Sequence, residues 1–552
     1  MDNIRLILLF AFAFICLMLY QAWMTDYGSP QVVAPQQTAE IVPAATESAG
    51  VPTASVTAAA TGSGDQAVPI AAGITTLGGK MVRVETDLLK VEISTLGGTV
   101  LRVHLLDYLV SPETPEQKFE LFSPAMPNLF IAQSGMIGSE EGKAPTHESE
   151  YKIEQSEFRL EDGQDKIDVA MTWTGSDGLK VTKHFIFSRG SYLIDVVHEV
   201  DNQSVKPWAA RDYAQLQRTE PTDQSRLTTY TYTGGVYYNP EVKYEKVDFD
   251  EMAEKRLSVD ATDGWLAMIQ HYFLGAWIPP KTQLEHYYTN SLPGPKYLIG
   301  SYSPSTTVAP GDSHSFSKQL YVGPKLQDHL ETVAPGLELT VDYGWLTVIA
   351  QPIFWLLKKI HSWVGNWGWS IIFLTIIIKA LFFKLSETSY KSMANMRKLT
   401  PRLQAMKDRY GDDKQRLNQA MMEMYKKEKV NPLGGCLPIV VQIPVFIALY
   451  WVLLESVELR HAPFVLWLDN LTAKDPYFVL PLIMGVSMFV QQKLNPAPPD
   501  PMQAKIMMSL PFVFTIFFAF FPSGLVLYWV VNNLISIAQQ YYITRKIEQA
   551  SS

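Results

Sequence analysis

The strongest constraint on this 552-residue chain is a set of long apolar runs that begins after residue 366. A helical span needs about 20 mostly apolar residues, and only helices or closed barrels satisfy backbone polar groups within lipid. The five runs are Trp367 to Leu385, Leu437 to Leu454, Tyr477 to Val490, Ile506 to Phe521 and Leu525 to Ala538. The third run is short, and it is long enough only if Gln491 and Gln492 lie at the interface. The sequence therefore predicts a multi-pass α-helical membrane protein, with a span at 365–385 and four further spans over 433–546.

A sixth apolar run, Leu6 to Tyr20, lies at the N-terminus. A cleavable signal peptide has a basic start and small residues at its cleavage site. Here Arg5 is the only basic residue before the run, and Trp23 and Met24 occupy the positions of the small residues. We favour an uncleaved signal anchor over residues 1–27, which makes six spans, and a cleaved signal peptide is the alternative. Residues 28–75 are mostly Ala, Pro, Thr, Ser, Gln and Val with almost no charge, which predicts a flexible linker.

Residues 76–335 have a different pattern, in which apolar and polar residues alternate with period two, as in Val181 to Phe187. Turn signals such as Ser176-Asp-Gly and Thr233-Gly-Gly separate these segments. Many short strands with regular turns predict a large all-β sandwich. From Lys80 to Pro335 the chain has 24 Lys and Arg against 36 Asp and Glu, so this domain is acidic, whereas the rest has a small positive balance. The net charge of −9 for the whole chain therefore describes neither part. An acidic net charge also argues against DNA as a partner.

The distribution of basic residues predicts the orientation in the membrane. The segment from Lys384 to Lys429 contains 12 Lys and Arg, and short loops rich in these residues stay in the cytoplasm. Alternation then places the β domain in the periplasm and both termini in the cytoplasm, so we expect the inner membrane of a Gram-negative-type bacterium. Residues 336–364 carry Trp345, Trp355 and Trp363, which are typical of the membrane interface, and we expect an amphipathic helix lying on the bilayer.

Motifs for an enzyme are missing from the sequence. Gly73 to Lys80 resembles a P-loop but is one residue too long and lacks the final Ser or Thr. No metal-ligand spacing or nucleophile motif is present, so we predict no catalytic residue, no metal and no cofactor. Cys16 and Cys436 are expected to be free thiols.

Lys379 is the sharpest polar feature, because it lies in the middle of the first of the five runs. A charge at the bilayer centre costs at least ~2.5–3.5 kcal/mol on insertion scales, so it marks a functional cavity by default. The alternative is that the long side chain reaches the cytoplasmic interface. Because Lys384 already occupies that end, we favour a hydrated groove that is open to the cytoplasm. Thr375 lies on the same helix face, and Gln442 and Asn532 fit the same groove, although interhelical hydrogen bonding is the simpler explanation for each alone.

Residues 386–432 are predicted to form a cytoplasmic helical hairpin with its turn at Tyr410-Gly-Asp-Asp, since apolar residues recur at spacings of three and four. One interpretation is a self-packed antiparallel coiled coil. The other is a Met-rich, basic surface that adapts to varied apolar clients and to ribosomal RNA. The two are compatible, because one face can pack while the other binds. The residues singled out are Met393, Met396, Arg397, Leu403, Met406, Arg409, Met421 and Met424.

Five stretches are specific enough to indicate a family. They are Gly411-Asp-Asp-Lys-Gln-Arg, Lys429-Val-Asn-Pro-Leu-Gly-Gly-Cys-Leu-Pro, Val457-Glu-Leu-Arg, Asp500-Pro-Met-Gln and Phe521-Pro-Ser-Gly-Leu-Val-Leu-Tyr-Trp. Together they resemble the YidC-type membrane protein insertases in their Gram-negative form. The resemblance implies a periplasmic β-supersandwich related in fold to sugar-mutarotase-like domains, and insertion and folding of membrane proteins without nucleotide hydrolysis.

The resemblance also implies roles for individual residues. The family usually has Arg at the position of Lys379, and the charge would attract acidic residues in a client's outgoing segment. Positions that line the groove or contact clients are matched by Thr375, Phe446, Met484, Phe517 and Trp529, the last standing where Tyr is common. The implied partners are nascent membrane proteins, the Sec translocon, membrane lipids and the ribosome. The tail at 547–552 is short and lacks the family's basic residues, which leaves the hairpin as the expected ribosome contact.

Two other functions remain as alternatives. A small-solute transporter would use Lys379 as a binding charge, although the sequence has no internal repeat of the kind that many transporters have. An enzyme would have its site in the β domain. Deleting about residues 80 to 320 should then abolish activity, whereas an insertase should largely tolerate the deletion.

Overall fold

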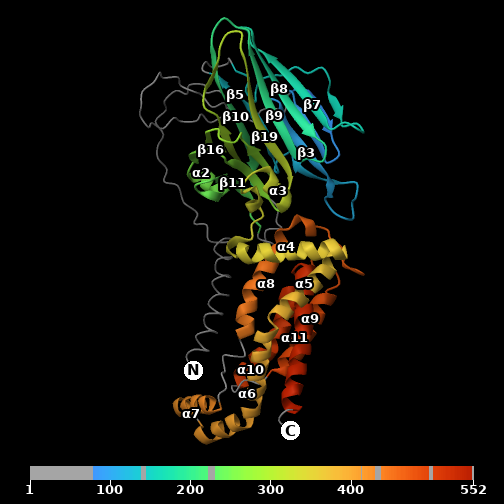
Figure 1. Ribbon diagram of the computed structural model, residues 1–552, viewed down its shortest axis with the longest axis vertical. Coiled ribbons are helices and arrows are strands. Elements are labelled where there is room, and N and C mark those ends of the chain that lie inside the picture. Colours follow the sequence, from blue (N-terminus) through green and yellow to red (C-terminus); the bar gives the residue numbers. More distant parts are fainter. Residues whose placement is uncertain are drawn as a thin grey trace, which may run out of the picture.

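The computed structural model describes residues 79–138, 144–221, 231–411, 413–428, 437–495 and 501–549. The predicted N-terminal anchor, the linker and both cysteines lie outside these residues. Figure 1 shows an all-β part at one end, a bundle of helices at the other, and one helix lying crosswise between them.

The β part consists of two packed sheets, which confirms the predicted sandwich. The first sheet contains β1 (Met81–Glu85), β2 (Leu89–Ser94), β3 (Thr99–Leu109), β4 (Lys118–Phe122), β5 (Phe130–Gly138), β6 (Glu157–Arg159), β10 (Trp208–Thr219), β13 (Ser258–Ala261), β16 (Glu285–Leu292), β17 (Lys296–Tyr302) and β18 (Thr306–Val308). The second contains β7 (Lys166–Thr174), β8 (Leu179–Ser188), β9 (Leu193–Asn202), β11 (Gly234–Asn239), β12 (Lys243–Val247), β14 (Trp265–Gln270), β15 (Phe273–Ile278) and β19 (Ser313–Pro324).

Strand order brings distant parts of the chain together. The first sheet runs β13-β16-β17-β10-β5-β3-β2-β1-β6, with β18 paired to β10 and β4 to β3. The second runs β12-β11-β14-β15-β19-β9-β8-β7. In the second sheet β19, the last strand, therefore lies between β15 and β9 and joins the two halves of the sheet.

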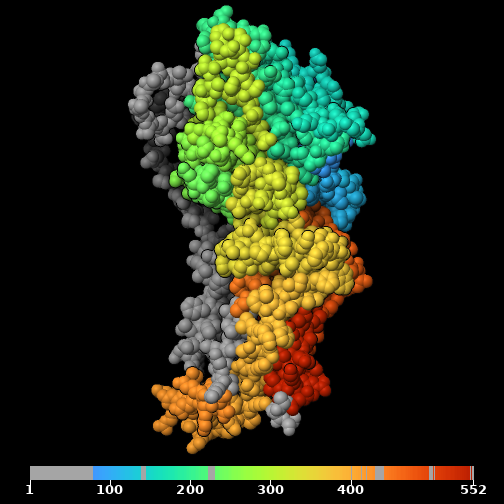
Figure 2. All heavy atoms as spheres, in the orientation of Figure 1, coloured from blue at the N-terminus to red at the C-terminus, as the bar shows by residue number. Residues whose placement is uncertain are grey.

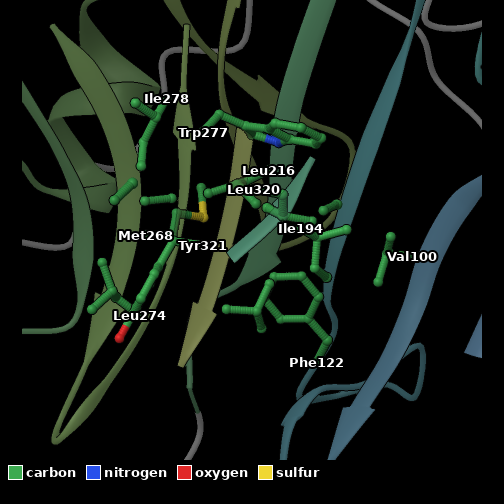
Figure 3. Close-up of a cluster of buried hydrophobic side chains, with 14 of the residues drawn as sticks. Val100, Phe122, Ile194, Leu216, Met268, Leu274, Trp277, Ile278, Leu320 and Tyr321 are labelled. Atoms are coloured by element: carbon green, nitrogen blue, oxygen red, sulfur yellow. The ribbon is translucent and has the colours of Figure 1, made fainter. Parts of the chain in front are cut away.

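The alternating sequence explains why these segments are strands. Along β8 every second side chain, from Leu179 to Phe187, is buried, and the residues between them are more exposed. Gly178 precedes this strand with φ of +92°, a conformation that suits glycine. Most inward side chains of the two sheets form one large apolar core, with Phe122 and Leu216 facing Trp277 and Leu320 (Figure 3), while Leu179 and Val181 belong to a smaller cluster. The Trp277 indole also donates to the carbonyl of Gln215 at 3.1 Å, which ties one sheet to the other.

Two short helices lie within the β part, and the others follow it. They are α2 (Phe249–Glu254) and α3 (Gln327–Val333) within the β part, then α4 (Thr347–Val364), α5 (Trp367–Leu381), α6 (Phe383–Tyr410), α7 (Lys414–Lys427), α8 (Leu437–Glu455), α9 (Val479–Leu494), α10 (Pro501–Phe518) and α11 (Ser523–Gln549), with short 3-10 turns η2 (Leu337–Thr340), η3 (Gly344–Leu346) and η5 (Val457–Leu459). Within the described ranges, none of the helices alone is both long and apolar enough for a span. The bent pair Trp367–Leu381 and Phe383–Leu399, which meets at 66°, passes that test together. The predicted number of six spans stays a prediction.

The helix α4 lies crosswise below the sandwich, as the yellow band in Figure 2 shows. One face of α4 packs inward through Phe354 and Leu357. On the opposite face Trp355 and Trp363 are 66% and 77% exposed. Exposed tryptophans on an amphipathic helix are typical of a helix that lies in a membrane interface, and this location of α4 stays a prediction.

The break between α5 and α6 differs from the predicted boundary. The sequence placed the end of the span at residue 385, whereas α5 ends at Leu381 and α6 begins at Phe383. The N–H of Phe382 donates to the carbonyl of Ile378, as in a regular helix, and also to that of Ala380, so the hydrogen bonding is irregular at this residue. The chain therefore bends inside the apolar run, and the start of α6 still belongs to the bundle.

The end of α8 joins the sandwich to the bundle. Lys325, which follows β19, pairs with Glu455 at 3.0 Å, and both side chains are buried. His271 donates to the carbonyl of Leu454 at 2.9 Å, and Arg460 donates to the carbonyl of Leu109 at 2.6 Å. Val457 packs in the core of the sandwich. The β part thus holds the end of a helix that carries two of the predicted groove residues.

Candidate functional site

Lys379 lies near the end of α5, and its side chain is only 3% exposed. Its ammonium donates to Ser536 Oγ on α11 at 2.8 Å and lies 3.5 Å from Gln442 Oε1 on α8. Among the described residues, no carboxylate pairs with this ammonium. Three helices therefore surround a buried positive charge with neutral oxygen atoms.

Thr375 lies one helical turn before Lys379 and is 1% exposed. Its hydroxyl donates to the carbonyl of Ile371 in the same helix at 2.6 Å. This local bond satisfies the hydroxyl, so Thr375 contributes a buried polar atom without bridging to another helix.

Two predicted residues form an aromatic contact beside the charge-bearing helices. Phe446 on α8 meets Trp529 on α11 edge to face, with ring centroids 4.5 Å apart. Trp529 also contacts Phe518 of α10 at 5.2 Å. Within the described part of the chain, the buried indole N–H of Trp529 has no hydrogen-bond acceptor. An aromatic cluster with a free donor thus lies where α8, α10 and α11 meet.

The other predicted groove residues have different positions. Met484 on α9 is fully buried in the core of the bundle. Phe517 on α10 is 54% exposed and packs against Phe518 and Phe521. Asn532 on α11 reaches the site through its backbone, because its carbonyl accepts the hydroxyl of Ser536 at 2.7 Å. The structure therefore brings Lys379 and Gln442 together, and it brings Phe446 and Trp529 together. Met484 lies inside the bundle, whereas Phe517 lies at its surface.

The sequence reasoning missed several polar partners. Ser536 and Gln540 are 2% and 3% exposed, and Gln540 donates to the carbonyl of Leu494 at 3.2 Å. Ser487 on α9 was also missed, and it accepts a hydrogen bond at 3.1 Å from Asn533, which the sequence does place in the groove beside Asn532. A signal was present, because Asn532, Ser536 and Gln540 are spaced four apart and line one face of a helix.

The hairpin of α6 and α7 packs against itself. Leu403 and Leu399 on α6 and Tyr425 on α7 are buried together. Around them pack the thioethers of Met396, Met406, Met421 and Met424. Most of the predicted methionines thus fill the hairpin core, while Met393 lies outside that cluster.

The basic residues of the hairpin lie mainly on its surface. Arg397 is exposed and donates to the carbonyl of Leu494, which ties α6 to the end of α9. Arg402 pairs with Glu428 at 2.6 Å across the two arms. Arg409 is exposed and stacks on Tyr410. A packed apolar interior and a charged exterior can therefore coexist.

Comparison with known proteins covers both parts of the chain. A family model described as the YidC periplasmic domain matches residues 81–356, and one described as the 60Kd inner membrane protein matches residues 359–550. The chain is 52% identical to the membrane protein insertase YidC of Methylococcus capsulatus over 552 residues, covering 100% of this chain and 99% of the relative. It is 50% identical to that of Thioalkalivibrio sulfidiphilus, again covering 100% of this chain and 99% of the relative.

This chain belongs to the YidC family of membrane protein insertases. It is thus an inner-membrane protein whose relatives are named insertases and not enzymes, which agrees with the expectation that it is not an enzyme.

Solved structures give weaker matches. A crystal structure of an active YidC insertase covers 84% of this chain and 93% of its own, with 18% identity and a TM-score of 0.39. A galactose mutarotase related enzyme from Lactobacillus acidophilus covers 44% of this chain and 97% of its own, with 11% identity and a TM-score of 0.33.

Proposed function

We propose that this insertase moves client segments through a hydrated groove, open to the cytoplasm, in which Lys379 supplies a positive charge. The observation that carries the proposal is a buried ammonium whose oxygen partners in the described residues, Ser536 and Gln442, are both neutral. A buried charge without a counter-ion is costly, so a fold retains one where the charge acts on a ligand or a hydrated cavity. An incoming carboxylate would supply the missing counter-ion.

The mechanism follows from this positive charge that has no counter-ion. An acidic residue in the outgoing segment of a client is attracted to Lys379, which draws the segment part of the way across the membrane. A hydrated groove shortens the apolar distance that remains, because fewer polar groups lose their water. Thr375 and Asn532 add polar atoms to the groove. No nucleotide is needed, because the apolar helix that follows gains free energy on entering lipid.

An apolar client helix would leave along the aromatic side of the groove. Phe446 and Trp529 form its wall, and the exposed ring of Phe517 extends it outward. Aromatic rings bury large areas and tolerate varied apolar partners. Met484 supports this wall from inside the bundle.

The orientation and partners follow the distribution of charge. The basic hairpin of α6 and α7 lies at the end of the bundle opposite the sandwich (Figure 1). We place the hairpin in the cytoplasm, where its exposed basic residues meet the ribosome and nascent chains, and the sandwich in the periplasm. The exposed tryptophans of α4 then contact lipid headgroups. The groove serves clients either alone or beside the Sec translocon.

The charge can be tested by inserting two clients that differ only in the outgoing segment, one acidic and one neutral. We expect Lys379→Ala to slow the acidic client by about tenfold, which equals about 1.4 kcal/mol, and to affect the neutral client much less. Lys379→Arg keeps the charge and should retain activity, whereas Lys379→Glu should block the acidic client. Insertion rates of reconstituted protein in liposomes measure the effect, and wild-type insertion of the acidic client by Lys379→Glu would refute the groove charge.

A further inference from the structure

Ser536 is the residue that lies against the Lys379 ammonium at 2.8 Å, and no motif or expectation had singled it out. We propose that Ser536 and Tyr390 are positioning residues that hold the Lys379 ammonium in place as a neutral stand-in for the carboxylate of a client. This inference rests on the proposed function, because it assigns a resting partner to the same charge.

The hydrogen bonds of Ser536 fix its role as an acceptor. Its own O–H donates to the carbonyl of Asn532 one turn earlier at 2.7 Å. A hydroxyl has one donor and two acceptor sites, so both lone pairs remain for other groups. The Lys379 ammonium donates to one of them, and the hydroxyl of Tyr390 interacts with the same side chain. Because the Ser536 hydrogen is engaged by its own helix, the side chain presents lone pairs to the charge.

Tyr390 brings a second structural element to this site. It is 8% exposed and belongs to α6, the helix that begins after the break at Phe382 and continues into the cytoplasmic hairpin. Ser536 belongs to α11. The acceptor for Lys379 is thus assembled from the last helix and from the base of the hairpin, and its geometry depends on how α6 packs on α11.

A neutral acceptor suits a charge that must later bind a carboxylate. A serine oxygen holds the ammonium in position but leaves its charge uncompensated. A carboxylate forms a charge-assisted hydrogen bond, which is about twice as strong as a neutral one, so an acidic client can replace the serine. A carboxylate built into this position would instead neutralise Lys379 permanently.

The test measures the ratio of insertion rates for the acidic and neutral clients, using full-length protein in liposomes. We expect Ser536→Ala to lower the ratio about threefold, because the ammonium loses its best acceptor, and Ser536→Thr to restore it, because the hydroxyl returns. Tyr390→Phe should lower the ratio in the same direction. Ser536→Asp should reduce the ratio to the value of Lys379→Ala, since the charge is then paired within the protein.

Ser370→Ala is the matched control. Ser370 is also a buried serine that donates to its own helix, to the carbonyl of Asn366 at 2.7 Å, but it lies at the other end of α5. We expect the control to leave the ratio unchanged. Suppose that Lys379→Ala lowers the ratio as expected. The positioning role is then overturned if Ser536→Ala keeps the wild-type ratio, or if it slows the insertion of both clients equally. If Lys379→Ala leaves the ratio unchanged, the proposed function itself fails, and this inference fails with it.

Discussion

At the scale of single residues, Gly485 allows α9 and α10 to pack closely. A Cβ atom added there would lie 2.0 Å from Thr515 Oγ1 and 3.2 Å from Thr515 Cβ. Because the Thr515 side chain or its helix must shift, we expect Gly485→Ala to cost about 1–3 kcal/mol of stability. Gly485→Ala combined with Thr515→Ala should recover part of the loss, since the closest atom is removed. Thermal unfolding of the purified protein in detergent measures both variants, and additive effects of the two changes would contradict this contact.

At the scale of elements, the buried Lys325–Glu455 pair fastens the end of α8 to the sandwich. Breaking a buried pair leaves an uncompensated charge and costs about 3–5 kcal/mol, whereas replacing both partners with apolar residues is often neutral. We therefore expect Lys325→Met to lower the melting temperature clearly and Lys325→Met with Glu455→Met to restore it. A double-mutant cycle on melting temperatures measures the coupling. If the double variant is as unstable as the single one, the pair does not hold this joint.

At the scale of the whole molecule, the joint between sandwich and bundle should depend on pH. Burial raises the pKa of Glu458 to about 7 from a usual value of 4.5, because the ionised carboxylate is disfavoured in the folded protein. Between about pH 4.5 and pH 7 the folded state therefore binds more protons than the unfolded state, and stability falls as the pH rises through this window. Burial lowers the pKa of His271 to about 4, which acts in the opposite direction: stability falls as pH drops from about 6.5 to 4.

Glu458→Gln isolates the first of these effects, because glutamine stays neutral at every pH. We expect the melting temperature of Glu458→Gln minus that of the wild type to grow between pH 5 and pH 7 and to level off above, reaching a stability gain of about 2 kcal/mol. A difference that stays constant across this range would show that Glu458 does not titrate in the folded protein.

Much of this molecule could be predicted without coordinates. The alternation of Val181 to Phe187 predicted a strand, and the apolar spacing around Leu403 predicted a hairpin arm, because both patterns repeat within one segment. Lys379 stood out because a charge within an apolar run is costly whatever surrounds it. The crosswise helix α4 was likewise expected from its tryptophans.

The partners of these residues could not be predicted in the same way. Strand β19 lies between β15 and β9, and no pattern within β19 specifies that order. Likewise, the sequence could not show which face of α9 meets its neighbours, and in the structure Met484 lies in the core of the bundle.

The sequence by itself determined the division into an acidic β domain, an apolar bundle and a basic hairpin, and it identified the charge at Lys379. These properties depend on residues that are close together along the chain, and their spacing can be read directly from the sequence. Only the tertiary structure decided that Ser536, 157 positions away, is the acceptor for that charge, and that Lys325 holds Glu455. Such contacts depend on how separate helices and strands rotate and pack against one another, and that packing is settled by the whole chain at once.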